Sequence, residues 1–310
     1  MYPKMLVSEA ADILNVSVQS IHKKLKEMNL EVKKEKHKIH FTHSTSKELF
    51  KKKFVKKVYS FQLVKGGVGK TVISLNFAIR ASLLGAKVAL IELDQQANLT
   101  RTFNINANDQ PIMIDIVNDK LSLSNNLVEV LDGLHFLPSR VDNALLDNTL
   151  LLGKHPLDKV FTKPIQNLKK MFDIIVIDCP PSIGPSVVAA ALASDTIVLP
   201  INPTDYSLAG LELTFNELQN LFEQYEKEIQ LKILFNKYNA RTNLSFNTIS
   251  EIIKHPKYSK YLIQGYIRHL QAIDNSIAEN KSVFDTFRKT PEKEDFSVIT
   301  SELLEEINNA

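Results

Sequence analysis

The 310-residue sequence predicts an α/β fold, with a doubly wound, mostly parallel sheet and a small helix-turn-helix module at the N-terminus. Strand-forming runs alternate with helical runs, which is typical of a parallel sheet with helices on both faces. The runs lie near residues 58, 87, 133, 172, 195, 231 and 262. The first 57 residues carry 14 lysines against 6 acidic residues, whereas residues 58–310 have a net charge of −5. This difference indicates two modules, and the basic one suggests a polyanionic partner.

Composition excludes several classes of protein. With 44% hydrophobic and 24% charged residues, the chain can bury a core, so disorder and coiled coil are excluded as its main state. The single cysteine, Cys179, cannot form an internal disulfide or a metal site made of cysteines alone, which predicts a reducing compartment, the cytoplasm. No run approaches the roughly 18 apolar residues of a membrane span, so we expect a soluble protein.

The N-terminal module, residues 1–45, has the pattern of two short helices joined by a tight turn. Apolar residues keep helical spacing from Leu6 to Leu14 and again from Val18 to Met28. Ser17 suits the N-cap of the second helix. That helix would present a polar and cationic face, which fits the major groove of DNA. The predicted DNA contacts on it are Gln19, Ser20, Lys23 and Lys24.

The stretch Ser8–His22 resembles a winged or MerR-like helix-turn-helix, and residues 31–42 look like two short strands around a charged turn. The resemblance implies that the module binds DNA. The alternative is a helical hairpin whose lysines only keep it soluble. Residues 46–57, rich in lysine around a few apolar side chains, are predicted to form a basic linker helix.

A strand, a glycine loop and a helix follow one another at the start of the second module. The β-prone run 58–64 leads into Lys65-Gly-Gly-Val-Gly-Lys-Thr71, which holds three of the nine glycines, and a helical run follows. Amides can point inward at phosphate oxygens only where side chains leave the backbone open to close approach. Lys70 would neutralise the phosphates of ATP and Thr71 would bind Mg²⁺. The predicted nucleotide contacts are Lys65, Gly66, Gly67, Val68, Gly69, Lys70, Thr71 and Val72.

The loop departs from the general P-loop pattern, because Val64 stands where G-x-x-x-x-G-K-[ST] has its first glycine, and Lys65 follows it. In this exchange the sequence resembles the ParA/MinD family of deviant Walker A ATPases. The resemblance implies a nucleotide-sandwich homodimer, in which Lys65 reaches the phosphates of the partner's ATP.

Two further apolar runs end in an acidic residue, as the central strands of a parallel sheet do at their ligand-binding edge. The run 87–98 is similar to the family's "D-x-D-P-Q-x-N" ending, which implies that Asp94 positions the attacking water, although Glu92 and Gln95 depart from the pattern. An aspartate here could also cap the next helix. The run 172–178 ends in Asp178, which takes the Walker B place and holds Mg²⁺ through its water.

The resemblance continues to the C-terminal part. Asn236, which ends the run 231–236, lies where relatives contact the adenine. The segment 266–275 is similar to the family's "I-P-R-x-V-R-L-x-E-A", with Arg268 on its first arginine and Gln271 in place of its second. In relatives that segment contacts DNA nonspecifically, which implies the same role for Arg268.

Together these features predict an ATPase of DNA partition, for a plasmid or a chromosome, with Lys65, Lys70 and Asp94 as catalytic residues and ATP and Mg²⁺ as cofactors. The resemblance implies that the ATP-bound dimer binds DNA at the nucleoid and that a ParB-like centromere-binding protein stimulates hydrolysis to ADP and phosphate. The N-terminal module would repress its own operon. One alternative is a repressor that uses ATP only as an allosteric ligand. Another, a MinD-like membrane-positioning ATPase, needs a basic C-terminal helix, whereas residues 301–310 are acidic.

Overall fold

The computed structural model describes residues 1–203 and 207–304. Its centre is an eight-stranded sheet of order β11-β10-β9-β4-β8-β5-β7-β6, in which all neighbours are parallel except β6 and β7. The seven predicted strands and the mostly parallel sheet are confirmed, and the edge strand β6 is an addition. The strands are β4 (Lys57–Phe61), β5 (Val88–Glu92), β6 (Val128–Leu131), β7 (Leu134–Leu137), β8 (Ile174–Asp178), β9 (Thr196–Ile201), β10 (Gln230–Tyr238) and β11 (Leu262–Arg268).

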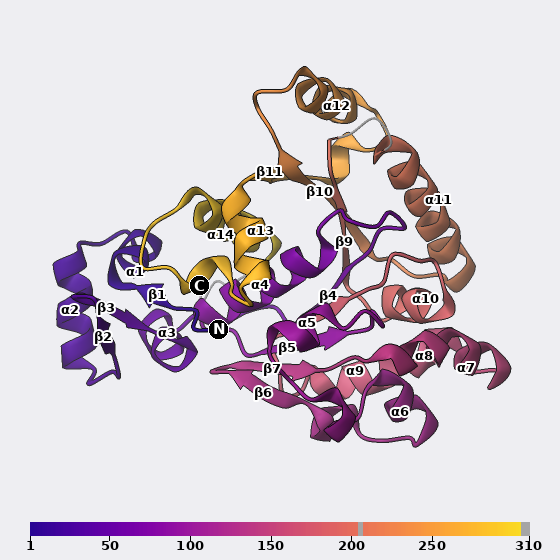
Figure 1. Ribbon diagram of the computed structural model, residues 1–310, viewed down its shortest axis with the longest axis horizontal. Coiled ribbons are helices and arrows are strands. Elements are labelled where there is room, and N and C mark those ends of the chain that lie inside the picture. The colour runs from indigo at the N-terminus through magenta and orange to yellow at the C-terminus, as the bar shows by residue number, and fades with distance from the viewer. Residues whose placement is uncertain (204–206, 305–310) are drawn as a thin grey trace.

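Helices cover both faces of this sheet (Figure 1). Successive side chains of a strand point to opposite faces. Tyr59 of β4 therefore packs with α4 (Lys70–Leu83) and α14 (Pro291–Leu303), whereas its neighbour Val58 packs with α10 (Pro185–Leu192) on the other face. The other helices of this part are α5 (Asn98–Thr102), α6 (Met113–Asn118), α7 (Leu146–Leu152), α8 (Leu157–Val160), α9 (Thr162–Leu168), α11 (Ser207–Tyr225), α12 (Asn243–Lys254) and α13 (Gln271–Ala278), with short 3-10 helices at Ala107–Asp109, Leu123–Asn126, Val141–Leu145, Ser259–Tyr261 and Val283–Asp285.

The N-terminal residues form the two helices and the hairpin that the sequence predicts. Ser17 caps the second helix, since its hydroxyl accepts a hydrogen bond from the Ser20 amide at 3.1 Å. A short strand before the helices completes a three-stranded antiparallel sheet of order β1-β3-β2. The elements are β1 (Met5–Leu6), α1 (Val7–Leu14), α2 (Val18–Glu27), β2 (Lys33–Glu35), β3 (Lys38–Phe41) and α3 (His43–Phe50).

This N-terminal module shares its core with the large sheet. Met5 and Ile21 belong to the same buried cluster as Phe77 of α4 and Phe296 of α14. The Lys4 amide donates to the Phe284 carbonyl at 3.1 Å. The module is therefore docked on the face that α4 and α14 cover, at the left of Figure 1, and the two share one buried core.

The basic linker helix predicted at 46–57 is wrong. Helix α3 starts earlier, at His43, and ends at Phe50, where Lys51 takes the left-handed conformation with φ of 49°. The chain must turn there because Phe54 is buried in the shared core and β4 begins at Lys57. Asp132, in the turn between β6 and β7, accepts hydrogen bonds from the Ser44 amide and hydroxyl and so fixes the start of α3.

No helix among residues 1–203 and 207–304 is long and apolar enough to cross a membrane. Of the acidic segment 301–310, the last six residues lie outside the described part of the chain.

Candidate functional site

The loop between β4 and α4 and the ends of β5 and β8 meet at one edge of the sheet. Carboxyl ends of parallel strands form the ligand-binding edge of such folds. Gly67 and Gly69 have φ of 73° and 90°, which residues with a Cβ rarely adopt, so the glycines allow the tight turn into α4. The free amides of the first turn of α4 then point into the same space as the amides of the glycine loop.

A cavity of about 330 Å³ opens over this loop. Two predicted nucleotide contacts, Val68 and Lys65, and the predicted Mg²⁺ residue Asp178 do not line it. Val68 turns into the core below the loop, at 1% exposed, while Lys65 lies outside the lining and is considered below. Asp178 is a fully buried residue next to the cavity. The predicted residues that do line the cavity are Gly66, Gly67, Gly69, Lys70, Thr71, Val72, Asp94 and Asn236.

Lys70 is a buried cation at the base of the cavity. Its Nζ atom donates to the carbonyl oxygens of Leu63 at 3.0 Å and Lys65 at 3.2 Å. Burial lowers the pKa of Lys70, against the pull of the charges of Asp178, Cys179 and Asp94. An anion in the cavity would replace these neutral carbonyl partners with a charged one, which is the stronger hydrogen bond.

Asp178 has the properties of a residue that holds a cation. Both of its carboxylate oxygens are buried, and neither has a hydrogen-bond partner within the described residues. The Ser74 hydroxyl, which lies nearby, donates to the Thr71 carbonyl instead. Burial and the charge of Asp94 raise the pKa of Asp178 to about 7, although the nearby Thr71 and Ser74 hydroxyls and the charge of Lys70 lower it. A buried carboxylate left unpaired beside the Thr71 hydroxyl fits Mg²⁺, which prefers oxygen ligands.

Asp94 and Glu92 have separate tasks. The Asp94 carboxylate accepts from the Gln96 amide at 2.9 Å and does not bond to α5, so the alternative of a helix-capping aspartate is wrong at this position. Glu92 caps the helix instead, accepting from the amides of Leu99 at 2.7 Å and Thr100 at 3.0 Å. The loop between β5 and α5 is therefore fixed at two places, by the bond between Asp94 and the Gln96 amide and by the bonds between Glu92 and the start of α5. These bonds hold Asp94 at the cavity wall.

Asn236, at the end of the neighbouring strand β10, supports the glycine loop. Its Nδ2 atom donates to the Val68 carbonyl at 2.8 Å, and a Cβ added at Gly69 would lie only 2.3 Å from that atom. Asn236 therefore both lines the cavity and fixes the shape of the loop.

We expect Gly69→Ala to lower the free energy of unfolding by about 1–2 kcal/mol, because alanine must adopt a left-handed conformation and displace Asn236. Gly66→Ala is the matched control in the same loop, since its added Cβ would meet nothing within 4 Å and its φ is not left-handed. Denaturant unfolding of the nucleotide-free proteins measures both. Equal stability of the two variants would contradict the description of the loop.

The opposite wall of the cavity comes from a segment that the sequence analysis assigned to DNA. Arg268, at the end of β11, lines the cavity, and its Nε atom donates to the Asp295 carboxylate at 2.9 Å. The Arg268 guanidinium also lies 3.3 Å from Glu294, so it is held by two acidic residues of α14. A DNA contact by Arg268 stays a prediction, and these ion pairs count against it. The other lining residues that the sequence analysis missed are Asn98, Pro181, Lys237, His269, Leu270, Ile273 and Asp274.

The predicted DNA-reading face of α2 lies on the surface. Ile21 and Leu25 are buried, whereas Gln19, Lys23 and Lys24 are exposed and Ser20 is half-buried. Lys23 forms a 3.6 Å surface ion pair with Glu27 one turn later, which is worth little and leaves the lysine accessible.

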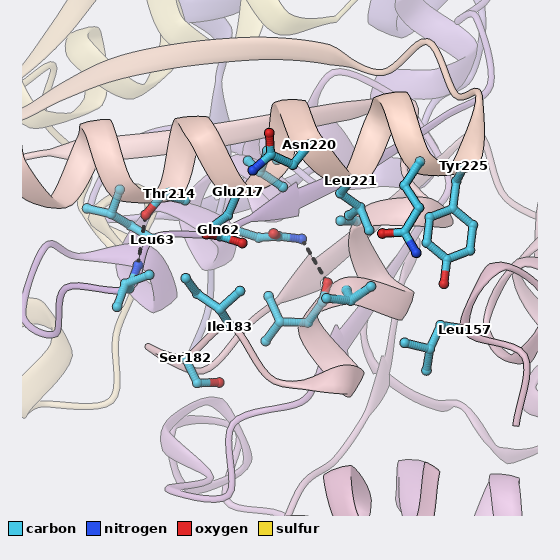
Figure 2. Close-up of a pocket in the computed structure, with 16 residues that line it drawn as sticks. Gln62, Leu63, Leu157, Ser182, Ile183, Thr214, Glu217, Asn220, Leu221 and Tyr225 are labelled. Carbon is cyan, nitrogen blue, oxygen red and sulfur yellow. Dashed lines mark hydrogen bonds between the residues drawn. The ribbon is translucent and has the colours of Figure 1, made fainter. Parts of the chain in front are cut away.

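A second cavity, of about 350 Å³, lies between α10 and α11 (Figure 2). Its wall includes Val64, which precedes the glycine loop, and Ser182 and Ile183, which follow the proline that lines the first cavity. The Val64 amide donates to the Thr214 hydroxyl of α11 at 3.4 Å. Two segments that line the first cavity, the glycine loop and the turn at Pro181, are therefore directly continuous with residues that line the second cavity.

Known proteins resemble the chain in the part that forms the large sheet. A family model described as an AAA domain matches residues 56–233, more than half of the chain. The sporulation initiation inhibitor protein Soj of Bacillus subtilis is 28% identical over 221 residues, covering 70% of this chain and 87% of Soj. The virulence plasmid ParA family protein pGP5-D of Chlamydia psittaci is 27% identical over 254 residues, covering 80% and 94%. The solved structure of a plasmid partition protein from Borrelia burgdorferi with bound AMPPNP covers 80% of this chain and 98% of its own, with 21% identity and a TM-score of 0.67.

Proposed function

The chain belongs to the ParA/MinD family of P-loop ATPases, and from this premise we propose that it is a DNA-partition ATPase of the ParA type. One observation carries the proposal. The glycine loop, the buried cation Lys70 and the anchored Asp94 line one cavity at the ligand-binding edge of the sheet, and the Asp178 carboxylate, which no described residue satisfies, is buried beside it. This arrangement supports binding and hydrolysis of ATP with Mg²⁺.

In this function the protein acts by positioning and charge, because phosphoryl transfer needs little covalent chemistry from side chains. Lys70 leaves the carbonyls of Leu63 and Lys65 and binds the β and γ phosphates. The Thr71 hydroxyl, and through water the Asp178 carboxylate, would hold Mg²⁺. Bound Mg²⁺ supplies positive charge to the phosphates. Asp94 orients the water that attacks the γ-phosphate.

Lys65 is proposed to act on the nucleotide of a second subunit. Its side chain is half-buried beside Gly210 of α11 and does not line the cavity of its own subunit, as far as the described residues show. In the proposed homodimer the nucleotide cavities of the two subunits would face each other, and Lys65 would reach the phosphates bound in the partner subunit. ATP would then close a homodimer, which is the form that binds DNA in the cytoplasm at the nucleoid.

The N-terminal module is proposed to read an operator, and a ParB-like centromere-binding protein to stimulate hydrolysis. The exposed face of α2 supports the first part, since base edges are read by a helix placed in the major groove. The protein would thus have two modes of DNA binding, a specific one through α2 and a nonspecific one that requires ATP.

The DNA that precedes the protein's own gene is the probe for the specific mode. We expect Gln19→Ala combined with Lys23→Ala to weaken binding to it by about tenfold or more, because a base contact and a phosphate contact are lost. The slope of log affinity against log salt should fall by about 0.9 for the phosphate contact. ATP-dependent binding to an unrelated duplex should stay unchanged. Fluorescence anisotropy at one fixed salt concentration measures both modes.

Lys163→Ala is the control, because it removes an exposed lysine from α9, outside the N-terminal module. Equal loss of specific binding in this control would mean that general charge, and not α2, carries the effect. A second candidate function is a repressor that uses ATP only as an allosteric ligand, which the core shared between the module and α4 supports. Phosphate release with DNA and the partner present separates the two, since the repressor would show none.

A further inference from the structure

A cleft of about 760 Å³ lies between α1 of the N-terminal module and α14, away from the nucleotide site. Two buried cations face it, Lys293 of α14 at 3% exposed and Arg80 of α4 at 5% exposed. Burial lowers the pKa of Lys293, and the charges of Arg80 and Lys4 lower it further, against the pull of Glu9. Two like charges therefore lie close together, on side chains that are almost entirely removed from water although they face the cleft.

The acidic residues that line the cleft already have partners. Glu9 binds the Lys293 ammonium at 3.0 Å with one carboxylate oxygen and accepts from the Leu6 amide at 2.8 Å with the other. Asp12 pairs with Lys289, and Glu294 pairs with Arg268. None of these ion pairs includes Arg80, although the charge of Glu9 raises the pKa of Arg80 against the larger effect of burial, which lowers it.

Arg80 and Thr290 have polar atoms without a partner in the same cleft. The Nε atom of Arg80 and the Oγ1 atom of Thr290 are both buried and form no hydrogen bond with any described residue. The Nη1 atom of Arg80 contacts the Met5 sulfur at 3.7 Å, which is a weak acceptor, and the Phe284 ring lies 5.4 Å away. A buried guanidinium is costly unless a charged acceptor satisfies it.

We propose that this cleft binds a small oxyanion of the phosphate class, held by the Arg80 guanidinium and the Thr290 hydroxyl. The planar fork of arginine matches two oxygens of such an anion, and the Lys293 ammonium adds charge. Thr290 is the N-cap of α14, so the free amides at the start of that 13-residue helix favour an anion as well. The anion would join α4, the helix that begins at the glycine loop, to the start of α14.

The test is calorimetric titration of inorganic phosphate, and in parallel sulfate, into the full-length protein saturated with Mg-ADP, so that the nucleotide site is filled. We expect Arg80→Met to weaken phosphate binding at least about tenfold, the equivalent of one charge-assisted hydrogen bond. Thr290→Val should weaken it several-fold. Arg288→Met, which removes an exposed arginine close to the cleft, should leave it unchanged.

Thermal unfolding of the full-length protein saturated with Mg-ADP gives a second readout, in which the nucleotide site is again filled. Phosphate should raise the melting temperature of the wild type but not of Arg80→Met, and without phosphate the variant should melt at or above the wild-type temperature, because a buried charge without a partner is gone. Equal phosphate affinity in wild type and Arg80→Met would overturn the proposal, since the phosphate would then bind beside the ADP. Absence of any phosphate effect on the wild type would overturn it too, because water would then satisfy Arg80 and Thr290.

Discussion

Lys70→Ala is expected to weaken Mg-ATP binding by at least about 100-fold, the equivalent of two lost charge-assisted hydrogen bonds. Lys70 is the buried cation at the base of the cavity, and its two carbonyl partners are neutral groups that phosphate oxygens can replace. Alanine leaves the loop amides without that charge. Equilibrium binding of a fluorescent ATP analogue measures the loss.

Lys65→Ala is the matched control, because it removes a lysine from the same loop at a side chain that does not line its own subunit's cavity, within the part of the chain described. A single subunit of this variant should still bind ATP, while dimer closure and turnover fail. Melting temperatures of both variants establish that the fold is intact. Wild-type affinity in Lys70→Ala would show that the glycine loop is not the nucleotide site.

The parallel strands could be predicted because each leaves a strong local signal. Strands buried on both faces are near-continuous apolar runs, as Ile174–Asp178 and Val88–Glu92 are. Strand β6, which was not predicted, lies at the edge of the sheet. Its four residues are half-buried or exposed. An edge strand of this kind does not need a long apolar run, so the sequence carries no strong signal for it.

The N-terminal module shows where local signals end. Helix spacing and the Ser17 cap act within a few residues and predict α1 and α2 correctly. The docking of the module depends on contacts such as Glu9 with Lys293, which are 284 positions apart. No periodicity encodes such a pair. Phe54 likewise belongs to the core that the module shares with the large sheet, and no local pattern predicts that burial, which is why the linker helix was predicted in the wrong place.

Site residues could be predicted where neighbours in the sequence form the geometry. They could not be predicted where separate strands must first come together. The glycine loop and Asp178 follow directly from a run of neighbouring residues. Arg268 had a motif that suggested DNA, but the fold brings it to the far wall of the cavity and pairs it with Asp295. Glu92 looked like an imperfect match to a family pattern, and only the structure gives it the task of capping α5.

Asp94→Ala is expected to lower ATP hydrolysis by at least about 100-fold while ATP still binds, because Asp94 lines the cavity and can orient a water, whereas Lys70 and the loop carry the affinity. Asp94→Asn separates this role from a structural one. Asparagine keeps an oxygen that can accept from the Gln96 amide, so the loop should retain its shape, but the negative charge is lost.

The two variants therefore give different results under the two explanations. If Asp94 orients the attacking water through its charge, both variants stop phosphate release at saturating Mg-ATP, and both still bind the fluorescent analogue. If Asp94 only shapes the loop, Asp94→Asn hydrolyses at close to the wild-type rate and Asp94→Ala alone is impaired. Wild-type hydrolysis in Asp94→Ala would move the water-positioning role to another residue. Phosphate release must be measured with DNA present, because the DNA-bound dimer is the state proposed to hydrolyse ATP.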